Sequence, residues 1–497
     1  EPRVELNVIP EIIRWHGRKK AVGAQFRRSA AILTKVVMAG GILAACSSGG
    51  EEVGLATAEF KGSAQNNTGL QLIDGPDTSV FVGAIASDEP RASLAARNVL
   101  ENGGTAVDAI TALYFNLAVT MPHEAGLGGG GICLVHDPEA REVTSYNFLA
   151  RRSRAGGPVA VPGNVRGFAL MHAVHGTSPW SSLVAPAEVL AAKGHEVSRA
   201  LAREIGPLAP AIRSLPQLAD VYLGPNGRGL QQGDLLVQKG LAAALGRARA
   251  SGPSGIYSGE IATAFAQEAT RLGSAITVEE MRAYRPSTQP AQTFKIGDQT
   301  LSIPAADTGA GTYMASIWPA AQSMKGAELM RAAQAELARA GAETNLPGSF
   351  GSTGFVVATA GGDAAACAVT MNGPFGTGRM VPGTGIIPAR APDAPGFGLA
   401  GAFLAPALVT NDFNGTFFFA GSSAGGPQAS ASVLEAANAL VATSTTLEAV
   451  HRSSVSNAQS LLNVVACPGG APREGASCVF GADPKGAGLG VLGFPPL

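Results

Sequence analysis

The stretch STGFVVATAGGDAAACAVTM at residues 352–371 decides the fold. It contains two apolar runs of strand length separated by Gly-Gly-Asp, a pattern typical of a β-hairpin. If 361–363 form the loop, Ser352 lies opposite Asn372, and Thr370 shares their face of the sheet. A hydroxyl nucleophile at a strand end, beside a second hydroxyl and an amide, is a usable catalytic arrangement. A polar sheet edge is the alternative.

Segments on both sides of this hairpin have helical or strand-like spacing. Thr105 is a plausible N-cap for an apolar helix that begins at Ala106. Further strands are expected at 132–136 and 416–420. Helices are expected at 92–100, 106–120, 164–175, 186–193, 236–250, 261–272, 278–283 and 428–442. Strands that bracket a block of helices predict α+β layers.

The composition is that of a globular protein. Of 497 residues, 46% are apolar and 15% are charged, which excludes a disordered polyelectrolyte and a coiled coil. Lys and Arg number 36 against 37 Asp and Glu, a net charge of −1. Such a balance provides no field to attract a phosphate backbone, so we expect no nucleic acid partner.

The first 46 residues have the pattern of an export signal. Basic residues cluster at 18–28, and an apolar run at 36–45, too short to span a bilayer, ends in Leu-Ala-Ala-Cys. This ending resembles the lipobox of bacterial lipoproteins. It implies a lipid on Cys46 and a place on the periplasmic side of a bacterial cell envelope, with membrane contact only through that anchor; an ordinary secretory signal is the alternative. We expect a flexible tether at 47–79 and the folded body from Val80.

The cysteine and histidine pattern predicts neither a cofactor nor a metal. No C-x-x-C pair occurs among the five cysteines. Cys467 and Cys478 flank a Pro/Gly-rich loop and could close a disulfide in an oxidising compartment. Cys133 and Cys367 are expected to be buried small hydrophobes. His172 and His175 are three apart on one expected helix but lack a third ligand, and we expect them to face solvent.

Two further motifs resemble known functional sites. Gly421-Ser422-Ser423-Ala424-Gly425 fits the G-x-S-x-G elbow, with a strand before it and a helix after it. The acid and histidine of a hydrolase triad cannot follow it in the usual order, because His451 precedes Asp483. The glycine run at 126–131 lacks a Gly-Lys-Ser/Thr ending and precedes a strand. We interpret it as a tight backbone turn packed beneath a site.

Several ordered segments resemble the gamma-glutamyltranspeptidase family of N-terminal-nucleophile (Ntn) hydrolases. The resemblance runs from about Ala84 to Ala442. The segments that carry it are Asn102 to Ala109, Pro122-His123 with the glycine run, Val161-Pro162-Gly163, Trp180 with Ala185-Pro186-Ala187, Ile256 to Gly259, Phe375 to Gly378, and Pro382 to Gly385. The resemblance implies a four-layer αββα sandwich within the α+β class.

In this family a precursor cuts itself before a pair of hydroxyl residues, and the first becomes both N-terminus and nucleophile. The resemblance therefore implies cleavage between Gly351 and Ser352, into associated parts 80–351 and 352–497, with Thr353 as the second residue of the pair. The resemblance implies that Thr370 is the hydroxyl partner of the nucleophile and that Asn372 contacts the substrate. It also implies that Gly425 and Gly426 form the oxyanion hole. An N-terminal residue carries its own base, because an α-amine has a pKa of about 7.7–8.0.

The sequence departs from the family at the positions that hold a free glutamyl head. Leu149 stands where the family has an arginine, with Arg151 and Arg152 nearby as possible substitutes. The paired serines fall near Ala402 and Phe403, and the aspartate that holds the substrate amine falls at Ala394, one after Asp393. These departures put the glutamyl pocket in question.

The expected function is that of a self-processing amidohydrolase or acyltransferase acting on a small molecule or peptide. By family resemblance the substrates are γ-glutamyl amides such as glutathione; another amide is the alternative if the altered pocket matters. An inactive family member that serves as an envelope binding protein or scaffold is a competing hypothesis.

Overall fold

The structure, a computed structural model, describes residues 81–342, 345–471 and 478–494. The export signal, Cys46 and the tether at 47–79 lie outside these residues. All described residues belong to one compact unit, Asn66–Leu497. Within this described part, no helix has both the length and the apolar character needed to cross a membrane.

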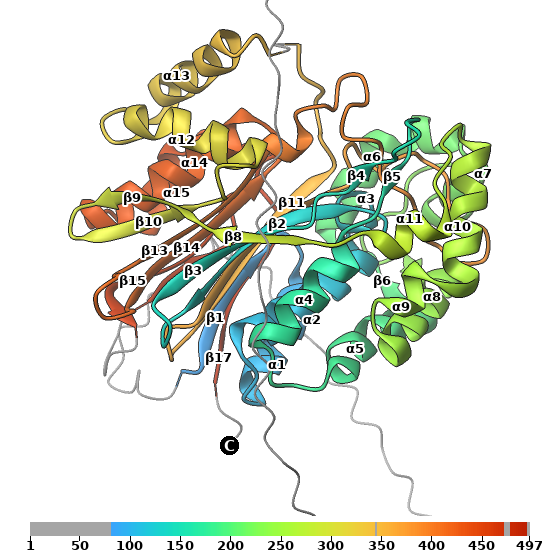
Figure 1. The fold of residues 1–497 in the computed structure, drawn as a ribbon, viewed down its shortest axis with the longest axis horizontal. Helices are drawn as coiled ribbons and strands as arrows, with labels where there is room; N and C mark the ends of the chain where they lie inside the picture. Colours follow the sequence, from blue (N-terminus) through green and yellow to red (C-terminus); the bar gives the residue numbers. More distant parts are fainter. Residues whose placement is uncertain (1–80, 343–344, 472–477, 495–497) are drawn as a thin grey trace, which may run out of the picture. The chain divides into compact units, whose positions relative to one another are not determined.

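Two antiparallel sheets lie at the centre of the fold (Figure 1). The order of the seven-stranded sheet is β17 (Leu489–Gly493), β1 (Gly83–Ser87), β11 (Ser352–Thr359), β12 (Ala364–Thr370), β2 (Gly130–Asp137), β3 (Glu142–Asn147), β8 (Ser287–Pro290). The order of the six-stranded sheet is β16 (Val479–Gly481), β15 (Asn463–Ala471), β14 (Phe417–Ala424), β13 (Leu404–Thr410), β10 (Gln299–Ile303), β9 (Gln292–Ile296).

Helices cover the outer face of each sheet, as Figure 1 shows. The helices that pack directly on the seven-stranded sheet are α1 (Pro90–Glu101), α2 (Ala106–Thr120), α3 (Pro122–Ala125) and α4 (Asn164–His175). The helices beyond them pack mainly on other helices and share the same core: α5 (Trp180–Lys193), α6 (Arg199–Arg213), α7 (Pro216–Tyr222), α8 (Lys239–Ser251), α9 (Ser254–Tyr257), α10 (Gly259–Arg271) and α11 (Val278–Ala283). The six-stranded sheet is covered by α12 (Gly309–Ala321), α14 (Pro427–Ala437) and α15 (Leu447–Ser453), and α13 (Gly326–Arg339) packs on α12 and α14. The expected αββα sandwich is therefore confirmed.

Strand β11 is buried on both faces. Phe355 and Val357 pack in the core between the sheet and its helices. Val356 and Ala358 pack in the core between the two sheets. Because neighbouring side chains on a strand point to opposite faces, a strand buried on both sides has an uninterrupted apolar run. This explains why the sequence at 352–360 shows no polar alternation.

The register of the β11–β12 hairpin differs from the expectation by two residues. Ser352 pairs with Thr370, not with Asn372. The turn closes at Thr359, whose N–H donates to the carbonyl of Asp363 at 2.9 Å. The loop is therefore 360–362, and its left-handed position is taken by Gly362 with φ 91°. A two-residue shift keeps each side chain on its face, so the expected grouping of side chains by face is retained.

Most expected helices lie close to their predicted bounds, and 106–120, 164–175 and 278–283 agree at both ends. Thr105 caps α2 in a reciprocal capping box with Asp108. Helix α5 begins at Trp180, well before the expected start, and encloses Pro186. The Trp180 indole N–H donates to the Ala248 carbonyl at 2.8 Å, and Leu183 is buried, so tertiary contacts hold this turn despite the proline.

The structure contains two disulfides. The one expected between Cys467 and Cys478 is present. Cys133 and Cys367 are also joined, which corrects the expectation that they are free buried thiols. The reason is the sheet topology, because β2 pairs with β12 and places these two cysteines directly opposite each other. That pairing could not be read from residues 234 positions apart.

Asp363 connects the hairpin to helix α2. Its carboxylate accepts from the Ala106 backbone N–H at 2.7 Å and from the Thr359 hydroxyl. We predict that Asp363→Ala lowers the free energy of unfolding by about 1–3 kcal/mol, because both donors lose their acceptor. Asp363→Asn keeps one acceptor oxygen and should cost less. Urea denaturation of both variants tests this, and equal stabilities for Asp363→Ala and the parent would contradict it.

Candidate active site

Ser352 is the first residue of β11 and is buried, at 4% exposure. Its Oγ lies 2.8 Å from Thr370 Oγ1, to which it can donate. The contact follows from the ladder, because Ser352 and Thr370 are directly opposite across β11 and β12. The structure thus brings together the predicted nucleophile and its predicted hydroxyl partner.

The carbonyl oxygen of Gly351 is surrounded by donors. It accepts from the Met371 backbone N–H at 2.9 Å, and Thr370 Oγ1 lies 3.3 Å away. The two hydroxyls can therefore form a chain in which Ser352 donates to Thr370 and Thr370 donates to the Gly351 carbonyl. Donors at a carbonyl oxygen stabilise the negative charge that develops when its carbon is attacked.

Gly351 has a conformation that few other residues adopt. Its φ is +59°, and a Cβ on it would lie 2.4 Å from the carbonyl carbon of Gly373. The Gly373 N–H also donates to the Phe350 carbonyl at 2.6 Å. Residues 350–351 are therefore held by hydrogen bonds and close contact against the chain that follows β12. The bond between Gly351 and Ser352 is thus held in a fixed position that a side chain at residue 351 would prevent.

Asn372 lies just beyond the end of β12, with φ 51°. Its backbone N–H donates to Thr370 Oγ1 at 2.9 Å, and its side-chain amide donates to the Arg390 carbonyl at 2.8 Å. Its backbone therefore orients the Thr370 hydroxyl, while its side chain is engaged away from Ser352.

The glycine run at 126–131 packs closely against the backbone at Thr370, as expected for a turn beneath the site. A Cβ on Gly129 would lie 2.6 Å from the Thr370 carbonyl oxygen, and one on Gly130 would lie 2.0 Å from the Ala150 nitrogen. The Gly129 carbonyl also accepts from the Gly163 N–H at 2.8 Å. Only glycine permits this close approach of three backbone segments.

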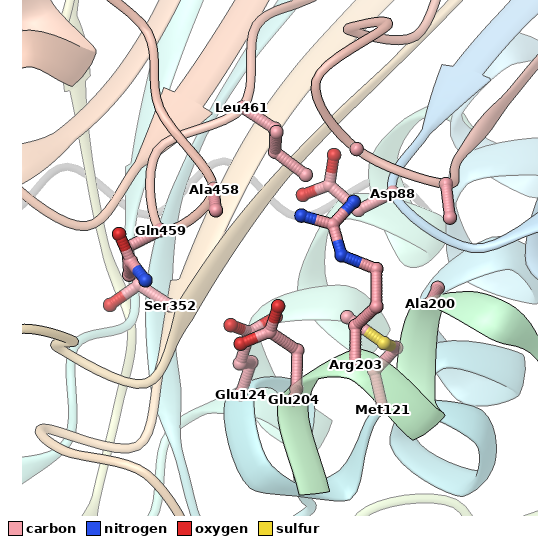
Figure 2. Close-up of a pocket in the computed structure, with 12 residues that line it drawn as sticks. Asp88, Met121, Glu124, Ala200, Arg203, Glu204, Ser352, Ala458, Gln459 and Leu461 are labelled. Carbon is pink, nitrogen blue, oxygen red and sulfur yellow. The ribbon is translucent and has the colours of Figure 1, made fainter. Parts of the chain in front are cut away.

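Gly425 and Gly426 follow β14 and precede α14. A Cβ on Gly425 would lie 2.1 Å from the carbonyl oxygen of Gln459. Gln459 lines the same cavity as Ser352, and Figure 2 shows its side chain beside the serine. The predicted oxyanion-hole pair is therefore packed against a loop that borders the cavity.

The cavity at Ser352 is small and acidic (Figure 2). It has room for about one water-sized occupant, about 20 Å³. Its lining includes three carboxylates and one guanidinium, those of Asp88, Glu124, Glu204 and Arg203. Sequence reasoning did not select the three acids, since only the tertiary structure brings the start of α1, helix α3 and helix α6 together.

Asp88 is fully enclosed beside the nucleophile. Thr353 Oγ1 donates to it at 2.6 Å and the Asn463 side-chain amide donates at 2.7 Å. Burial nevertheless raises the pKa of Asp88 to about 7, although these two hydrogen bonds oppose the shift. The Thr353 hydroxyl is therefore engaged with Asp88, and Thr353 does not line the cavity where a substrate contact was expected.

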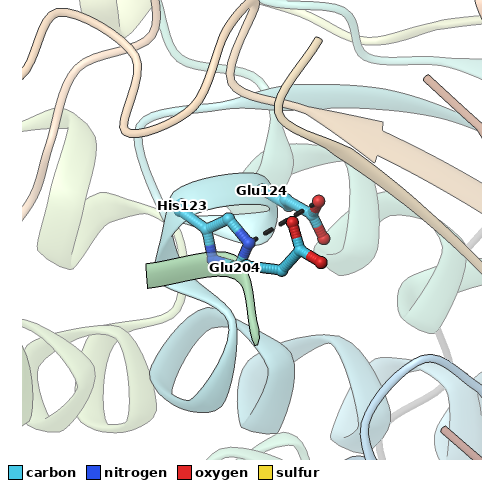
Figure 3. Close-up of side chains that lie close together, drawn as sticks. All are labelled: His123, Glu124 and Glu204. Carbon is cyan, nitrogen blue, oxygen red and sulfur yellow. Dashed lines mark ion pairs between the residues drawn. The ribbon is translucent and has the colours of Figure 1, made fainter. Parts of the chain in front are cut away.

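His123, Glu124 and Glu204 form a second group of ionisable side chains (Figure 3). Burial raises the pKa of Glu124 well above its usual range, and the neighbouring charges of Glu204 and Asp88 add to this. Burial also raises the pKa of Glu204. Burial lowers the pKa of His123 to about 3, so its imidazole is neutral at ordinary pH.

The residues expected to hold a substrate carboxylate and amine lie apart from this cavity. Arg152 and Asp393 form an ion pair with each other, and both are exposed. Arg151 is exposed, with its guanidinium 4.8 Å from the centre of the Tyr284 ring. Leu149 packs against an apolar cluster of Ile132, Ala310, Ala368, Leu404 and Ala424.

The other candidate motifs are structural. Ser423 lies within β14, fully buried, with its hydroxyl 3.3 Å from that of Ser460, so it is not on an exposed elbow. His172 bonds to the Ser178 carbonyl and His175 to the Tyr146 hydroxyl. These two histidines are therefore half-buried with separate partners, which corrects the expectation that they face solvent.

Two stacked sheets between helical layers are the architecture of the Ntn-hydrolase fold, and the hydroxyl residue at the start of an internal strand lies where that fold was expected to hold its nucleophile. Residues 92–322 match the family model described as gamma-glutamyltranspeptidase. Over these residues, somewhat less than half of the chain, the protein is similar to the gamma-glutamyltranspeptidase family. The matched residues include Leu149 and the glycine run and end before Ser352.

Curated relatives match part of the chain, and a solved structure shares its fold. "Glutathione hydrolase proenzyme" of Escherichia coli (strain K12) is 32% identical over 46% of this chain and 43% of its own. "Glutathione hydrolase proenzyme" of Bacillus subtilis (strain 168) is 31% identical over 41% of this chain and 38% of its own. The chain therefore spans less than half the length of these relatives.

Cephalosporin acylase from Bacillus halodurans shares the fold, with TM-score 0.67 and 16% identity over 88% of this chain and 99% of its own.

The pKa of Asp88 predicts a pH dependence of stability. Between about pH 4 and 7 the folded chain holds a proton that the unfolded chain has lost, so the free energy of unfolding falls as pH rises. The side chain of the Asp88→Asn variant cannot titrate. Its free energy of unfolding should therefore lack the contribution of Asp88 to this decrease, which is on the order of 4 kcal/mol between about pH 4 and 7. Urea unfolding of both proteins between pH 4 and 8 measures the difference. Parallel curves for the two proteins would contradict the assignment.

Proposed function

We propose that this protein is a self-processing amidohydrolase or acyltransferase in which Ser352, freed as a new N-terminus, is the nucleophile. The observation that carries the proposal is the chain from Ser352 Oγ to Thr370 Oγ1, 2.8 Å, and from there to the Gly351 carbonyl oxygen, 3.3 Å. The word "proenzyme" in the names of the two bacterial relatives also supports processing.

The first reaction is cleavage of the chain by its own serine. The Ser352 hydroxyl attacks the Gly351 carbonyl carbon while its proton passes toward Thr370 Oγ1. The C–N bond breaks, the Ser352 nitrogen gains a proton, and an ester joins Gly351 to Ser352 Oγ. Water then hydrolyses the ester and leaves a Gly351 carboxylate and a Ser352 with free α-amine and hydroxyl. The Met371 N–H, at 2.9 Å, stabilises the oxyanion of the first step.

The second reaction uses the new terminus on a substrate. With a pKa of about 7.7–8.0, a fraction of the α-amine is neutral at working pH and takes the proton from the Ser352 hydroxyl. The serine attacks the substrate amide carbon, the amine leaves with a proton, and water or an acceptor amine releases the acyl group. The N–H groups of Gly425 and Gly426 are proposed as the donors to the substrate oxyanion.

Two substrate classes follow from different observations. The names of the relatives favour γ-glutamyl amides such as glutathione. The apolar packing of Leu149, and the mutual pairing of Arg152 with Asp393 at the surface, favour an acyl group without a free carboxylate and amine. Mass spectrometry of a mixed amide library incubated with the processed protein distinguishes the two classes.

We predict that Ser352→Ala abolishes cleavage and all amide hydrolysis. Thr370→Val, which removes only a hydroxyl, should slow cleavage about 10²–10³-fold, because one donor to the developing oxyanion is lost. Ser423→Ala is the matched control and should be cleaved normally, since that serine has no part in the reaction. Reducing gels and the mass of each fragment provide the measurement.

The competing hypothesis, an inactive binding protein or scaffold of the cell envelope, predicts an uncut chain and no acyl-enzyme. An uncut parent protein, or cleavage of Ser352→Ala at the rate of the parent, would overturn the proposed chemistry. Either result would leave the assignment of the fold unchanged.

The disulfide between Cys133 and Cys367 gives the processed protein a distinctive property. These cysteines lie on opposite sides of the proposed cleavage site, in β2 and β12. We predict that the two fragments run as one species on a denaturing gel without reductant and as two species with it. In the double variant Cys133→Ala/Cys367→Ala the fragments should separate under both conditions. Separation of the parent fragments without reductant would show that the cross-link is absent.

We also propose that the protein acts outside the cytoplasm, held at the bacterial envelope by a lipid on Cys46. The two disulfides support this, because such bonds persist in oxidising compartments and are rare in the cytosol.

A further inference from the structure

A histidine and two glutamates meet at the edge of the cavity that contains Ser352. His123 Nε2 lies 3.6 Å from Glu124 Oε1, and the nearest ligand atoms of His123, Glu124 and Glu204 all lie within 4.8 Å of one another. Figure 3 shows the three side chains converging, two from α3 and one from α6. Glu124 and Glu204 also line the cavity itself.

His123 is an unpaired polar group in the interior. It is 1% exposed, and neither of its ring nitrogens has a hydrogen-bond partner. Buried polar groups are almost always paired, since an unpaired one loses its water without compensation. A neutral imidazole has one nitrogen with a free lone pair. The His123 ring therefore adds a third electron-pair donor to those of Glu124 and Glu204.

The charge of Arg203 lowers the pKa of Glu204, against the larger effect of burial, without forming an ion pair with it. Among the ion pairs of the described residues, neither Glu124 nor Glu204 is joined to a lysine or an arginine. The side chain of Arg203, which also lines the cavity, donates to the Lys485 carbonyl at 2.8 Å. Once ionised, the two carboxyl groups would both attract a cation placed between them, and that attraction favours their ionised form.

We propose that His123, Glu124 and Glu204 bind a divalent transition-metal ion of the Zn²⁺ type. One imidazole and two carboxylates are a common ligand set for such ions, whereas Mg²⁺ and Ca²⁺ prefer oxygen ligands alone. The cavity, with room for about one water-sized occupant, has the size for a single ion beside Glu124 and Glu204. Coordination at about 2.0–2.2 Å requires these ligand atoms, which lie within 4.8 Å of one another, to draw closer together.

An ion at this point would connect α3, which precedes the glycine run, to α6. It would also occupy the wall of the cavity opposite Gln459 and reduce the negative charge that faces Ser352. Because an ion that binds only the folded chain shifts the unfolding equilibrium, the bound protein should be more stable than the metal-free protein.

The test uses the full chain carrying Ser352→Ala, so that its outcome does not depend on processing. After treatment with a chelator, the protein is titrated with Zn²⁺ alone by calorimetry, and its melting temperature is measured with and without Zn²⁺. We expect one tight site per chain and a rise in melting temperature. Adding Glu204→Gln, or His123→Gln, should weaken binding at least tenfold and remove the rise. Glu328→Gln, an exposed glutamate on α13, is the matched control and should leave both unchanged.

Variant folding is checked by the metal-free melting temperature. Glu204→Gln removes a repelling charge and should not lower it, so loss of binding in that variant cannot be ascribed to unfolding. Absence of saturable Zn²⁺ binding overturns the proposal. Equal binding by the parent, Glu204→Gln and His123→Gln also overturns it, because the ion would then be held by other histidines of the chain.

Discussion

The pairing of Ser352 with Thr370 across two central strands is the constraint on which the rest of the structure depends. Both strands are buried on both faces, between a helical layer on one side and the second sheet on the other. A sheet in this position cannot slip by one residue without moving its apolar side chains to the wrong core. The backbone register therefore places the Ser352 hydroxyl next to the Thr370 hydroxyl and the Gly351 carbonyl. Both side chains are short, so the strand pairing largely determines their positions.

Cleavage before Ser352 would divide the chain without dividing the fold. Strand β11 lies between β1 and β12, and β12 pairs with β2, so the same sheet contains strands from both sides of the bond. Strands β9 and β10 from the first part likewise extend the second sheet. The two parts share both cores, and the Cys133–Cys367 disulfide joins them covalently. Separation of the two parts would expose both cores to water, and the free-energy cost of that exposure favours their staying associated after cleavage.

The surroundings of Ser352 are unusual in their charge. Asp88 and Glu124 are buried near the nucleophile, and burial raises the pKa of each. Such groups lower the stability of the folded chain at neutral pH, and proteins retain them mostly at sites where they serve binding or chemistry. By contrast, Leu149, which does not line this cavity, packs in an apolar cluster.

The sequence by itself determined the α+β class, the hairpin, the capping of α2 and the candidates Ser352 and Thr370, because these depend on local periodicity and on order along the chain. Only the tertiary structure decided the exact register, since Thr359 and Asp363 close the turn and the loop is 360–362 rather than 361–363. It also decided the Cys133–Cys367 bond, the engagement of Thr353 by Asp88, and the meeting of Glu124 with Glu204. These contacts join residues far apart in the chain, and no spacing rule encodes them, because they follow from how sheets and helices stack.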